Sequence, residues 1–275
     1  MNPTFKIHST ETATGNTELV LLVSLDSISF IISDAANKCI ALYSYQLTPD
    51  AGFDYTASQI KKVVLSQDLL NNGFEKITIV YAFPTAIIVP EQFSSDQAKK
   101  EMLDLVFGDQ NDALVRTDID TVQNRHIVYT VPNQVASVID YLFSSHKAKH
   151  LYSLLTVING LDGNDIYCIF WNNYFTAMLV KAGKLQAIQT YQYKSPDDVA
   201  YYLLHLCESF EVAVNDTILH LNGMVGENSN LYNELSKYFL HLQFESLPPV
   251  FTYPEAMKEY PAHYFSHLFA LASCV

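Results

Sequence analysis

Residues 165–210 decide the fold, and they read DIYCIFWNNYFTAMLVKAGKLQAIQTYQYKSPDDVAYYLLHLCESF. Three apolar segments are separated by Asn-Asn and Ala-Gly pairs, and Asn and Gly tolerate the positive φ angles of hairpin turns. The first two segments, Ile166–Trp171 and Phe175–Val180, are almost continuously apolar, which is typical of strands buried on both faces of a sheet. The stretch therefore predicts a three-stranded meander with helices on both sides.

The end of this stretch predicts a helix with a strong start signal. Ser195 is a natural N-cap, Pro196 suits the first helical position, and Asp198 stands where a capping-box acid reaches back. The apolar side chains that follow recur at helical spacing and form one stripe: Val199, Leu203, Leu206 and Phe210. We therefore expect the meander to continue into a helix that packs on the sheet.

The same layout occurs once before, between Leu19 and roughly Leu70. The two copies align without a gap, since 184 − 38 = 146 and 191 − 45 = 146, and the matched identities are Lys38 with Lys184, Tyr45 with Tyr191, and Gln46 with Gln192. Self-similarity at a fixed offset is the signature of a repeated unit. We favour an internal repeat, and the alternative is two independent meanders of a common type.

The first copy carries extra material at about residues 84–131. The pattern there predicts a strand, a helix and a hairpin, at Ala86–Val89, Ser94–Phe107, Ala113–Asp118 and Arg125–Val131. This is a β-α-β-β insertion, and no matching segment follows the second copy.

Two domains are predicted. The polar sequence LDGND at residues 161–165 reads as their junction. The N-terminal lobe then covers residues 1–161 and the C-terminal lobe residues 162–275. We expect residues 1–17 to form a polar arm and residues 262–273 to form the last helix.

Composition limits the classes of function. The chain has 275 residues, of which 49% are apolar, so it is long and apolar enough to bury a large core. Its net charge of −13, with only 16 Lys and Arg, argues against binding nucleic acid or an anionic membrane surface. The four cysteines are scattered without a C-x-x-C pair, which favours reduced thiols in a cytoplasmic protein. We expect no signal peptide and no membrane insertion, because the start is polar and the longest apolar run is interrupted by Asp26.

The order of these elements resembles a known fold. Two β-β-β-α-β-α-β-α halves in tandem resemble the actin-like ATPases, whose lobes have the RNase H-type fold. The insertion is similar to the extra subdomain of FtsA and of the pilus-assembly protein PilM. The string TYQYKSPDDVAYYLL at residues 190–204 resembles a short bacterial actin-like family of unknown function. The expected fold class is therefore α/β, with two tandem RNase H-like lobes built on mixed sheets.

The resemblance also implies where a nucleotide would be held. In actin-like ATPases the first hairpin of each lobe grips phosphate with an Asp that holds hydrated Mg²⁺ and a Gly whose amide approaches closely. The Asp is expected near Ser24 and Ile169, and the Gly near Asp26 and Trp171, yet none of the four positions matches. An indole at Trp171 fills the space of a phosphate, and a carboxylate at Asp26 repels one unless it holds a metal.

The adenine loop of these ATPases is a strand followed by paired glycines. The corresponding string here is LHLNGMVG at residues 219–226, in which Gly223 keeps its place and Gly226 follows three residues later. A plain Asn-Gly turn explains this string equally well. The positions that we expect to line a former nucleotide site are therefore Asp26, Ser27, Trp171, Asn172, Asn173 and Gly223.

Other candidate sites are weaker. His263 and His267 have the i, i+4 spacing of a helical Zn²⁺ pair, but no third ligand is evident, so we expect two helix-face residues and no metal. Asp118 and Asp120 have the types needed for a carboxylate pair, and we interpret them as surface charges on a strand. No catalytic residue and no cofactor are predicted.

Three functions remain open from the sequence. The leading hypothesis is a non-catalytic actin-like scaffold or binding protein with a degenerate nucleotide site and a protein partner. The alternatives are an actin-like ATPase with an atypical phosphate site, and a small-molecule sensor that uses the cleft expected between the lobes. The tyrosines and Phe265 near the C-terminus favour a partner if they form an exposed aromatic surface. The partner and the oligomeric state are not fixed by any motif.

Overall fold

The computed structural model describes the chain except at residues 1, 12, 49–50, 72, 158–162 and 275. The described residues fall into two compact units. Unit 1 contains residues 1–154 and 251–256, and unit 2 contains residues 155–250 and 257–274. Leu161 and Asp162 of the predicted junction lie outside the described residues, and the first strand of unit 2 begins at Asn164.

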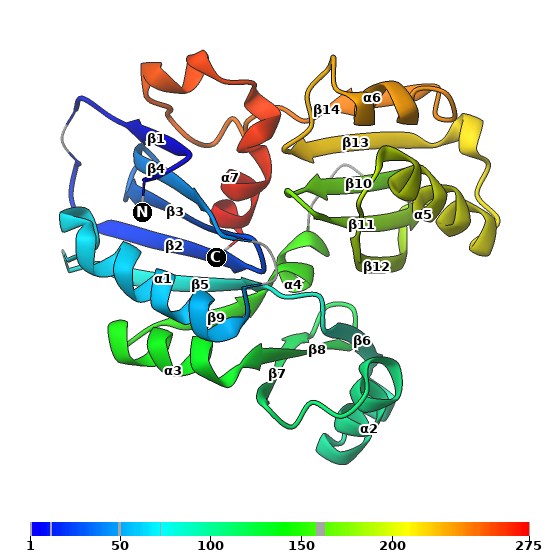
Figure 1. The fold of residues 1–275 in the computed structure, drawn as a ribbon, viewed down its shortest axis with the longest axis horizontal. Helices are drawn as coiled ribbons and strands as arrows, with labels where there is room; N and C mark the ends of the chain where they lie inside the picture. Colours follow the sequence, from blue (N-terminus) through cyan, green and yellow to red (C-terminus); the bar gives the residue numbers. More distant parts are fainter. Residues whose placement is uncertain (1, 12, 49–50, 72, 158–162, 275) are drawn as a thin grey trace. The chain divides into compact units, whose positions relative to one another are not determined.

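Unit 1 is built on a six-stranded mixed sheet of order β1-β4-β3-β2-β5-β9 (Figure 1). Its strands are β1 Phe5–His8, β2 Thr17–Ser24, β3 Ser27–Asp34, β4 Cys39–Gln46, β5 Lys76–Ala82 and β9 Lys147–His150. Helices α1 (Phe53–Ser66) and α3 (Asn133–Leu142) pack against each other and run alongside this sheet. The predicted meander and the helix after it are therefore present.

The N-terminal arm differs from the prediction. Residues Phe5–His8 form β1, which pairs antiparallel with β4, and Ile7 is completely buried. The segment lies within residues 1–17, which were predicted to form a polar arm. It is ordered because the end strand of the meander offers free backbone groups that a neighbouring strand satisfies.

The predicted insertion is a separate three-stranded sheet of order β6-β8-β7 with one helix. Its elements are β6 Ala86–Pro90, α2 Asp96–Phe107, β7 Ala113–Asp120 and β8 Arg125–Pro132. The Oγ atom of Ser95 accepts a hydrogen bond from the amide of Ala98 and caps α2. A small core of Val89, Leu103 and Val128 joins the helix to the sheet.

Unit 2 repeats the arrangement with a five-stranded sheet of order β12-β11-β10-β13-β14. Its strands are β10 Asn164–Phe170, β11 Tyr174–Lys181, β12 Lys184–Gln192, β13 Ile218–Gly223 and β14 His241–Phe244. Its helices are α5 Pro196–Ser209, α6 Asn230–Leu235 and α7 Ser266–Ser273. The predicted capping box is confirmed, since Ser195 and Asp198 exchange side chain-to-backbone hydrogen bonds at the start of α5.

Five strands of each sheet follow the same order and the same directions. In both units, two antiparallel neighbours are followed by two parallel ones. The second hairpin of each meander also has a register shift, between Ile32 and Ser33 in unit 1 and between Leu179 and Val180 in unit 2. Shared order, direction and irregularity support the internal repeat.

The remaining elements are short. They are the 3₁₀ helices η1 Asp68–Asn71, η2 Glu91–Phe93, η3 Val214–Asp216, η4 Glu255–Glu259 and η5 Ala262–Tyr264, and the helix α4 Leu151–Leu155. The last helix, predicted at residues 262–273, is divided into η5 and α7. No helix in the described ranges combines the length and the apolar character needed to cross a bilayer.

The two faces of the unit 2 sheet differ in chemistry. Side chains alternate between the faces of a strand. Ile166, Cys168 and Phe170 of β10 belong to the apolar core that also contains residues of α5 and α6. The intervening residues Asp165 and Tyr167 lie on the opposite face, which carries a set of buried polar side chains on β10 and β13.

Candidate functional site

The first hairpin of unit 1 closes on its own hydroxyl group. The last cross-strand pair is Val23 with Ile28, so Ser24 opens the turn. The Ser24 Oγ atom accepts hydrogen bonds from the amides of Asp26, at 3.4 Å, and Ser27, at 3.0 Å. The same hydroxyl lies 3.0 Å from Asp26 Oδ1, and both Ser24 and Asp26 are buried. The turn amides that a phosphate would need therefore already have an internal acceptor.

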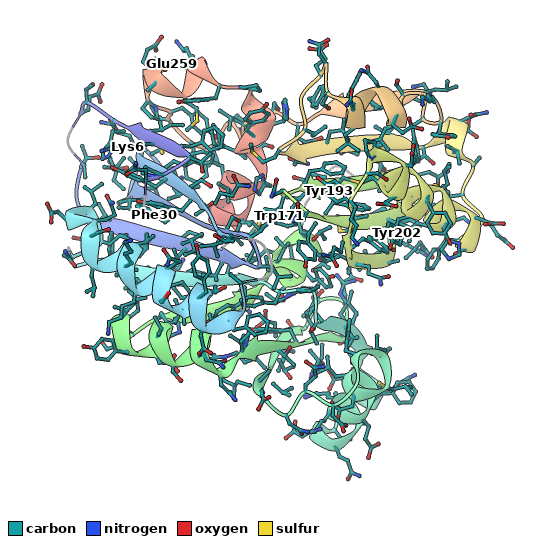
Figure 2. All side chains as sticks on the ribbon, viewed as in Figure 1. Lys6, Phe30, Trp171, Tyr193, Tyr202 and Glu259 are labelled. Atoms are coloured by element: carbon teal, nitrogen blue, oxygen red, sulfur yellow. The ribbon has the colours of Figure 1, made fainter. Side chains whose placement is uncertain are left out.

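The turn of the first hairpin of unit 2 contains a buried indole ring, that of Trp171. The last cross-strand pair is Phe170 with Phe175, so Trp171 opens the turn. The Trp171 amide donates to the Tyr174 carbonyl oxygen at 2.9 Å, and the Tyr193 hydroxyl donates to the Trp171 carbonyl oxygen at 3.0 Å. The side chain of Trp171 is buried, and Figure 2 shows it at the end of the sheet with Tyr193 beside it.

These pairings correct the predicted alignment of the two hairpins. Ser24 corresponds to Trp171, and 171 − 24 = 147, so Asp26 corresponds to Asn173. The earlier alignment matched Asp26 with Trp171. The offset is 147 along the first two strands and 146 along the third, because the turn before the third strand is one residue shorter in unit 2. Under either alignment the expected Asp and Gly are missing.

Gly223 has a role in the backbone of unit 2. Its φ of +78° is in the left-handed region. A Cβ atom there would lie 2.2 Å from the Phe170 carbonyl oxygen, and that oxygen accepts the Met224 amide at 2.8 Å. Gly223 is therefore required for the close approach of β13 to the end of β10. Gly226 has no such constraint, because the nearest atom to an added Cβ is the Tyr264 Oη at 3.8 Å.

The predicted cleft positions are thus distributed over both units. In unit 1, the backbone amides of Asp26 and Ser27 both donate to the Ser24 Oγ atom. In unit 2, Asn173 accepts the Tyr193 amide at 2.9 Å, and Asn172 belongs to the same turn. Each hairpin therefore has hydrogen bonds within its own turn or to the adjoining strand.

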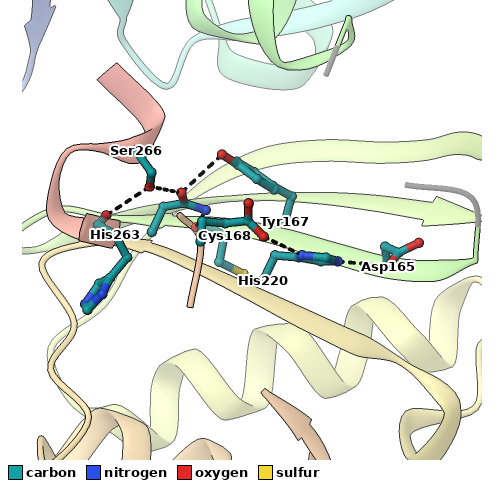
Figure 3. A network of polar contacts seen from close by, with 8 residues as sticks. Asp165, Tyr167, Cys168, His220, His263 and Ser266 are labelled. Atoms are coloured by element: carbon teal, nitrogen blue, oxygen red, sulfur yellow. Dashed lines mark hydrogen bonds and ion pairs between the residues drawn. The ribbon is translucent and has the colours of Figure 1, made fainter. Parts of the chain in front are cut away.

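A charged triad in unit 2, of which Asp165 and His220 are buried, was not predicted from the sequence. His220 on β13 lies between two carboxylates, with Nε2 2.9 Å from Asp165 Oδ1 and Nδ1 2.7 Å from Glu245 Oε1 (Figure 3). Burial lowers the pKa of His220, but the hydrogen bonds to Glu245 and Asp165 outweigh it, so the pKa is raised above 6.5. Two carboxylates and one imidazolium leave this group with a net negative charge.

A second polar chain lies beside the triad. The Asn222 Nδ2 atom donates to the Cys168 carbonyl oxygen at 3.1 Å, which fixes the orientation of the amide. Its Oδ1 atom accepts from the Tyr167 hydroxyl at 3.1 Å and from the Ser266 hydroxyl at 2.5 Å (Figure 3). One signal for this network was available, because Asp165 and Tyr167 occupy alternate positions of a strand whose other residues are apolar.

The two C-terminal histidines do not form a metal pair. His263 Nε2 lies 2.6 Å from the Val225 carbonyl oxygen, whereas the His267 ring packs edge-on against Trp171 at 6.3 Å. Burial lowers the pKa of His267 to about 3, so the ring is neutral. Among the residues that the structure describes, no group of three or more His, Cys, Asp or Glu is placed to hold a metal ion.

Asp118 is not a surface charge, and its interpretation as one was wrong. The side chain is 6% exposed and accepts the His150 amide at 2.7 Å and the Ser153 hydroxyl at 2.5 Å. It therefore fixes β9 and α4 to the insertion hairpin. Its neighbour Asp120 bonds the Arg125 Nε atom at 2.8 Å across that hairpin.

The C-terminal aromatic residues do not form an exposed surface. Phe265 is 1% exposed, and Tyr253, Tyr260 and Tyr264 are half-buried. These rings pack against other side chains of the chain, as the edge-on contact of Tyr260 with Phe265 illustrates.

Comparison with protein families decides the relationship. The family model described as "Protein of unknown function (DUF3822)" matches residues 6–242. The chain belongs to this family. The predicted membership of an actin-like family of unknown function is thereby confirmed, and the solved structures described next confirm the fold.

Three similar solved structures have low sequence identity to this chain. A protein of Bacteroides thetaiotaomicron with actin-like ATPase fold and unknown function has a TM-score of 0.77 at 17% identity, covering 94% of this chain and 96% of that one. The PilM–PilN type IV pilus biogenesis complex gives a TM-score of 0.63 at 11% identity, with 93% and 97% covered. The ethanolamine utilization protein EutJ of Carboxydothermus hydrogenoformans gives 0.52 at 9% identity, with 98% and 93% covered.

The DUF3822 chain therefore has an actin-like ATPase fold, as its element order predicted. A search of curated protein sequences finds no match. At these identities the likeness defines the fold and leaves the activity to be argued from the residues.

Proposed function

We propose that this protein is a non-catalytic actin-like scaffold whose nucleotide site is degenerate. The observation that carries the proposal is the hydroxyl group of Ser24, which accepts the two turn amides of the first hairpin. A phosphate would have to displace this internal acceptor and approach the buried carboxylate of Asp26 without a glycine in the turn.

The second hairpin supports the same proposal. Actin-like phosphate binding needs open backbone amides, and the Trp171 amide is bonded to Tyr174. The indole is buried, and the Tyr193 hydroxyl donates a hydrogen bond to the Trp171 carbonyl oxygen. Gly223, the one residue that keeps its place in the adenine-loop pattern, has a structural reason that involves no nucleotide.

Nucleotide titration tests the proposal. Trp171 is the only tryptophan, so its fluorescence reports directly on the second hairpin. We expect no saturable change in this fluorescence with Mg-ATP or Mg-ADP up to about 1 mM. A dissociation constant of about 1 mM corresponds to only about 4 kcal/mol of binding free energy. Calorimetric titration and an assay of phosphate release are the independent measurements. Micromolar affinity or measurable hydrolysis would overturn the proposal and favour the ATPase alternative.

We also propose that the scaffold acts through a protein partner that contacts the insertion. Of the 17 exposed large apolar side chains in the described part of the chain, seven lie in the insertion: Phe93, Leu105, Val106, Leu114, Val115, Ile119 and Val122. The predicted insertion covers only about 48 of the 275 residues, since 131 − 84 + 1 = 48, so exposed apolar side chains are concentrated in it. Concentrated exposed apolar side chains mark contact surfaces. The similar PilM structure is itself a complex with a protein, PilN.

Paired surface variants test the partner proposal. Leu105→Lys and Val122→Lys alter side chains that are 86% and 83% exposed, so the fold should be retained. Cross-linking in the native host should capture a partner with the wild type and lose it with these variants. The matched controls are Leu65→Lys and Leu240→Lys, which are exposed elsewhere. Equal capture by all four variants would exclude the insertion as the contact surface.

A further inference from the structure

Unit 2 contains a pocket of about 430 Å³ beside the polar network. It is lined by groups from β10, from the chain that follows β14, and from α7. Its polar lining includes Tyr167, Glu245 and Ser266, and its apolar lining includes Leu247, Pro248 and Ala270. The pocket combines a few convergent polar groups with apolar walls, which is typical of a small-molecule site.

The hydrogen bonds behind the pocket fix the polarity of its lining. Tyr167 and Ser266 both donate their hydroxyl protons to Asn222 Oδ1, and the amide cannot be reversed because its Nδ2 atom donates to Cys168. A hydroxyl group has one proton and two acceptor lone pairs. Both hydroxyl oxygens can therefore only accept a further hydrogen bond from a ligand.

Glu245 adds a carboxylate with a vacant oxygen. Its Oε1 atom is paired with His220, and no described residue bonds its Oε2 atom. The side chain of Glu245 is 25% exposed, whereas the side chain of Asp165, on the other side of His220, is 4% exposed. One imidazolium between two carboxylates leaves an excess negative charge, and Glu245 is the member of the triad that lines the pocket.

We propose that this pocket binds a small organic cation, a protonated primary amine with an apolar chain. The ammonium group has three donors, and the lining offers three acceptors on Tyr167, Glu245 and Ser266. The apolar chain would lie against Leu247 and Pro248. This site uses neither hairpin, so it goes beyond the scaffold function and stands or falls independently of it.

The reactivity of Cys274 provides the test. This thiol lines the pocket and is exposed, whereas the other three cysteines are buried. Alkylation of Cys274 by iodoacetamide, followed by mass spectrometry of the intact chain, should slow in the presence of n-pentylamine. Pentanol and pentanoate have similar chains without the ammonium group and should leave the rate unchanged. Calorimetric titration with the same three compounds gives the affinity.

Two variants assign the effect to the pocket. Glu245→Gln should weaken n-pentylamine binding about tenfold, because a charge-assisted hydrogen bond becomes a neutral one. The matched control Glu208→Gln, on the exposed face of α5, should bind like the wild type. Ala270→Phe should fill the pocket and abolish the protection of Cys274 by n-pentylamine. This variant provides an alternative test if Glu245→Gln disturbs the fold.

Three results would each overturn the proposal. The first is the absence of amine binding up to about 10 mM, a concentration at which a ligand with a millimolar dissociation constant would be bound. The second is equal binding of pentanol or pentanoate. The third is unchanged amine binding in both the Glu245→Gln and the Ala270→Phe variants.

Discussion

The first hairpins of the two units solve one structural problem with different side chains. Each encloses four residues after its last cross-strand pair, and the first of the four is Ser24 in unit 1 and Trp171 in unit 2. Ser24 closes its turn with hydrogen bonds, whereas Trp171 closes its turn by filling space beside His267. The comparison teaches that two copies of a repeated unit can close the same turn with different side chains.

The difference extends along the adjoining strands. By the same alignment, Tyr167 and Asn222 of unit 2 take the places of Val20 and Val80 in unit 1. At these two positions unit 1 has buried apolar side chains, whereas unit 2 has side chains that are joined by a hydrogen bond. The two copies therefore share backbone order while their buried chemistry has diverged, and this divergence can be measured.

The largest expected effect comes from breaking the backbone contact at the end of the second hairpin. Gly223→Ala places a Cβ atom 2.2 Å from the Phe170 carbonyl oxygen at a φ of +78°. We expect a loss of at least about 3 kcal/mol of unfolding free energy, measured by urea denaturation. Gly226→Ala is the matched control and should change stability by less than about 1 kcal/mol. A well-tolerated Gly223→Ala would show that β13 can move away from β10.

Removal of the indole tests the space-filling hairpin. Trp171→Ala leaves a void among buried side chains, and we expect a loss of about 3 kcal/mol of unfolding free energy. Trp171→Phe, which keeps an aromatic ring against His267, should recover about half of that loss. If both variants were as stable as the wild type, the indole would have no structural role in closing the turn.

Removal of the hydroxyl tests the hydrogen-bonded hairpin. Ser24→Ala leaves the amides of Asp26 and Ser27 without their acceptor, and we expect a loss of about 1–2 kcal/mol. The effect should be smaller than that of Trp171→Ala, since little volume is lost. A larger loss for Ser24→Ala than for Trp171→Ala would reverse the comparison of the two hairpins.

The smallest expected effect concerns pH and the charged network of unit 2. The pKa of His220 is raised in the folded chain, so the stabilisation from its protonation is fully present below about pH 6.5 and is lost as pH rises through the folded pKa. Between pH 6.5 and 9, the unfolding free energy of the wild type should therefore fall more than that of His220→Gln.

His205→Asn is the control for this measurement, because the His205 side chain is exposed on α5. It should keep the wild-type dependence on pH. A His220→Gln variant with that same dependence would exclude a raised pKa at His220.

The sequence predicted the elements that depend on local patterns. The strands of the unit 2 meander follow from continuous apolar runs, and α5 follows from Ser195 and Asp198, because capping and burial act over a few residues. The repeat was visible for the same reason. The strand β1 was not predicted, because its four residues show no alternating apolar pattern. The segment forms a strand because it pairs with β4, which is distant in the sequence.

The candidate sites were harder to predict, because they depend on which side chains meet. No sequence rule places Glu245 beside His220, since the contact joins segments that are 25 residues apart. The role of Ser24 as an acceptor for turn amides depends on a hydroxyl orientation that no spacing encodes. The burial of Asp118 depends on β9 and α4, which approach it only in the folded unit.

The pairing of β1 with β4 has a consequence for solubility. Backbone donors and acceptors at the margin of a sheet can recruit another chain and start aggregation. In unit 1 the segment Phe5–His8 occupies that margin, so deletion of those residues would uncover β4 to intermolecular pairing. The corresponding end strand of unit 2, β12, has no such cover in the described sheet and relies on exposed polar residues, including Lys184, Gln186 and Gln189.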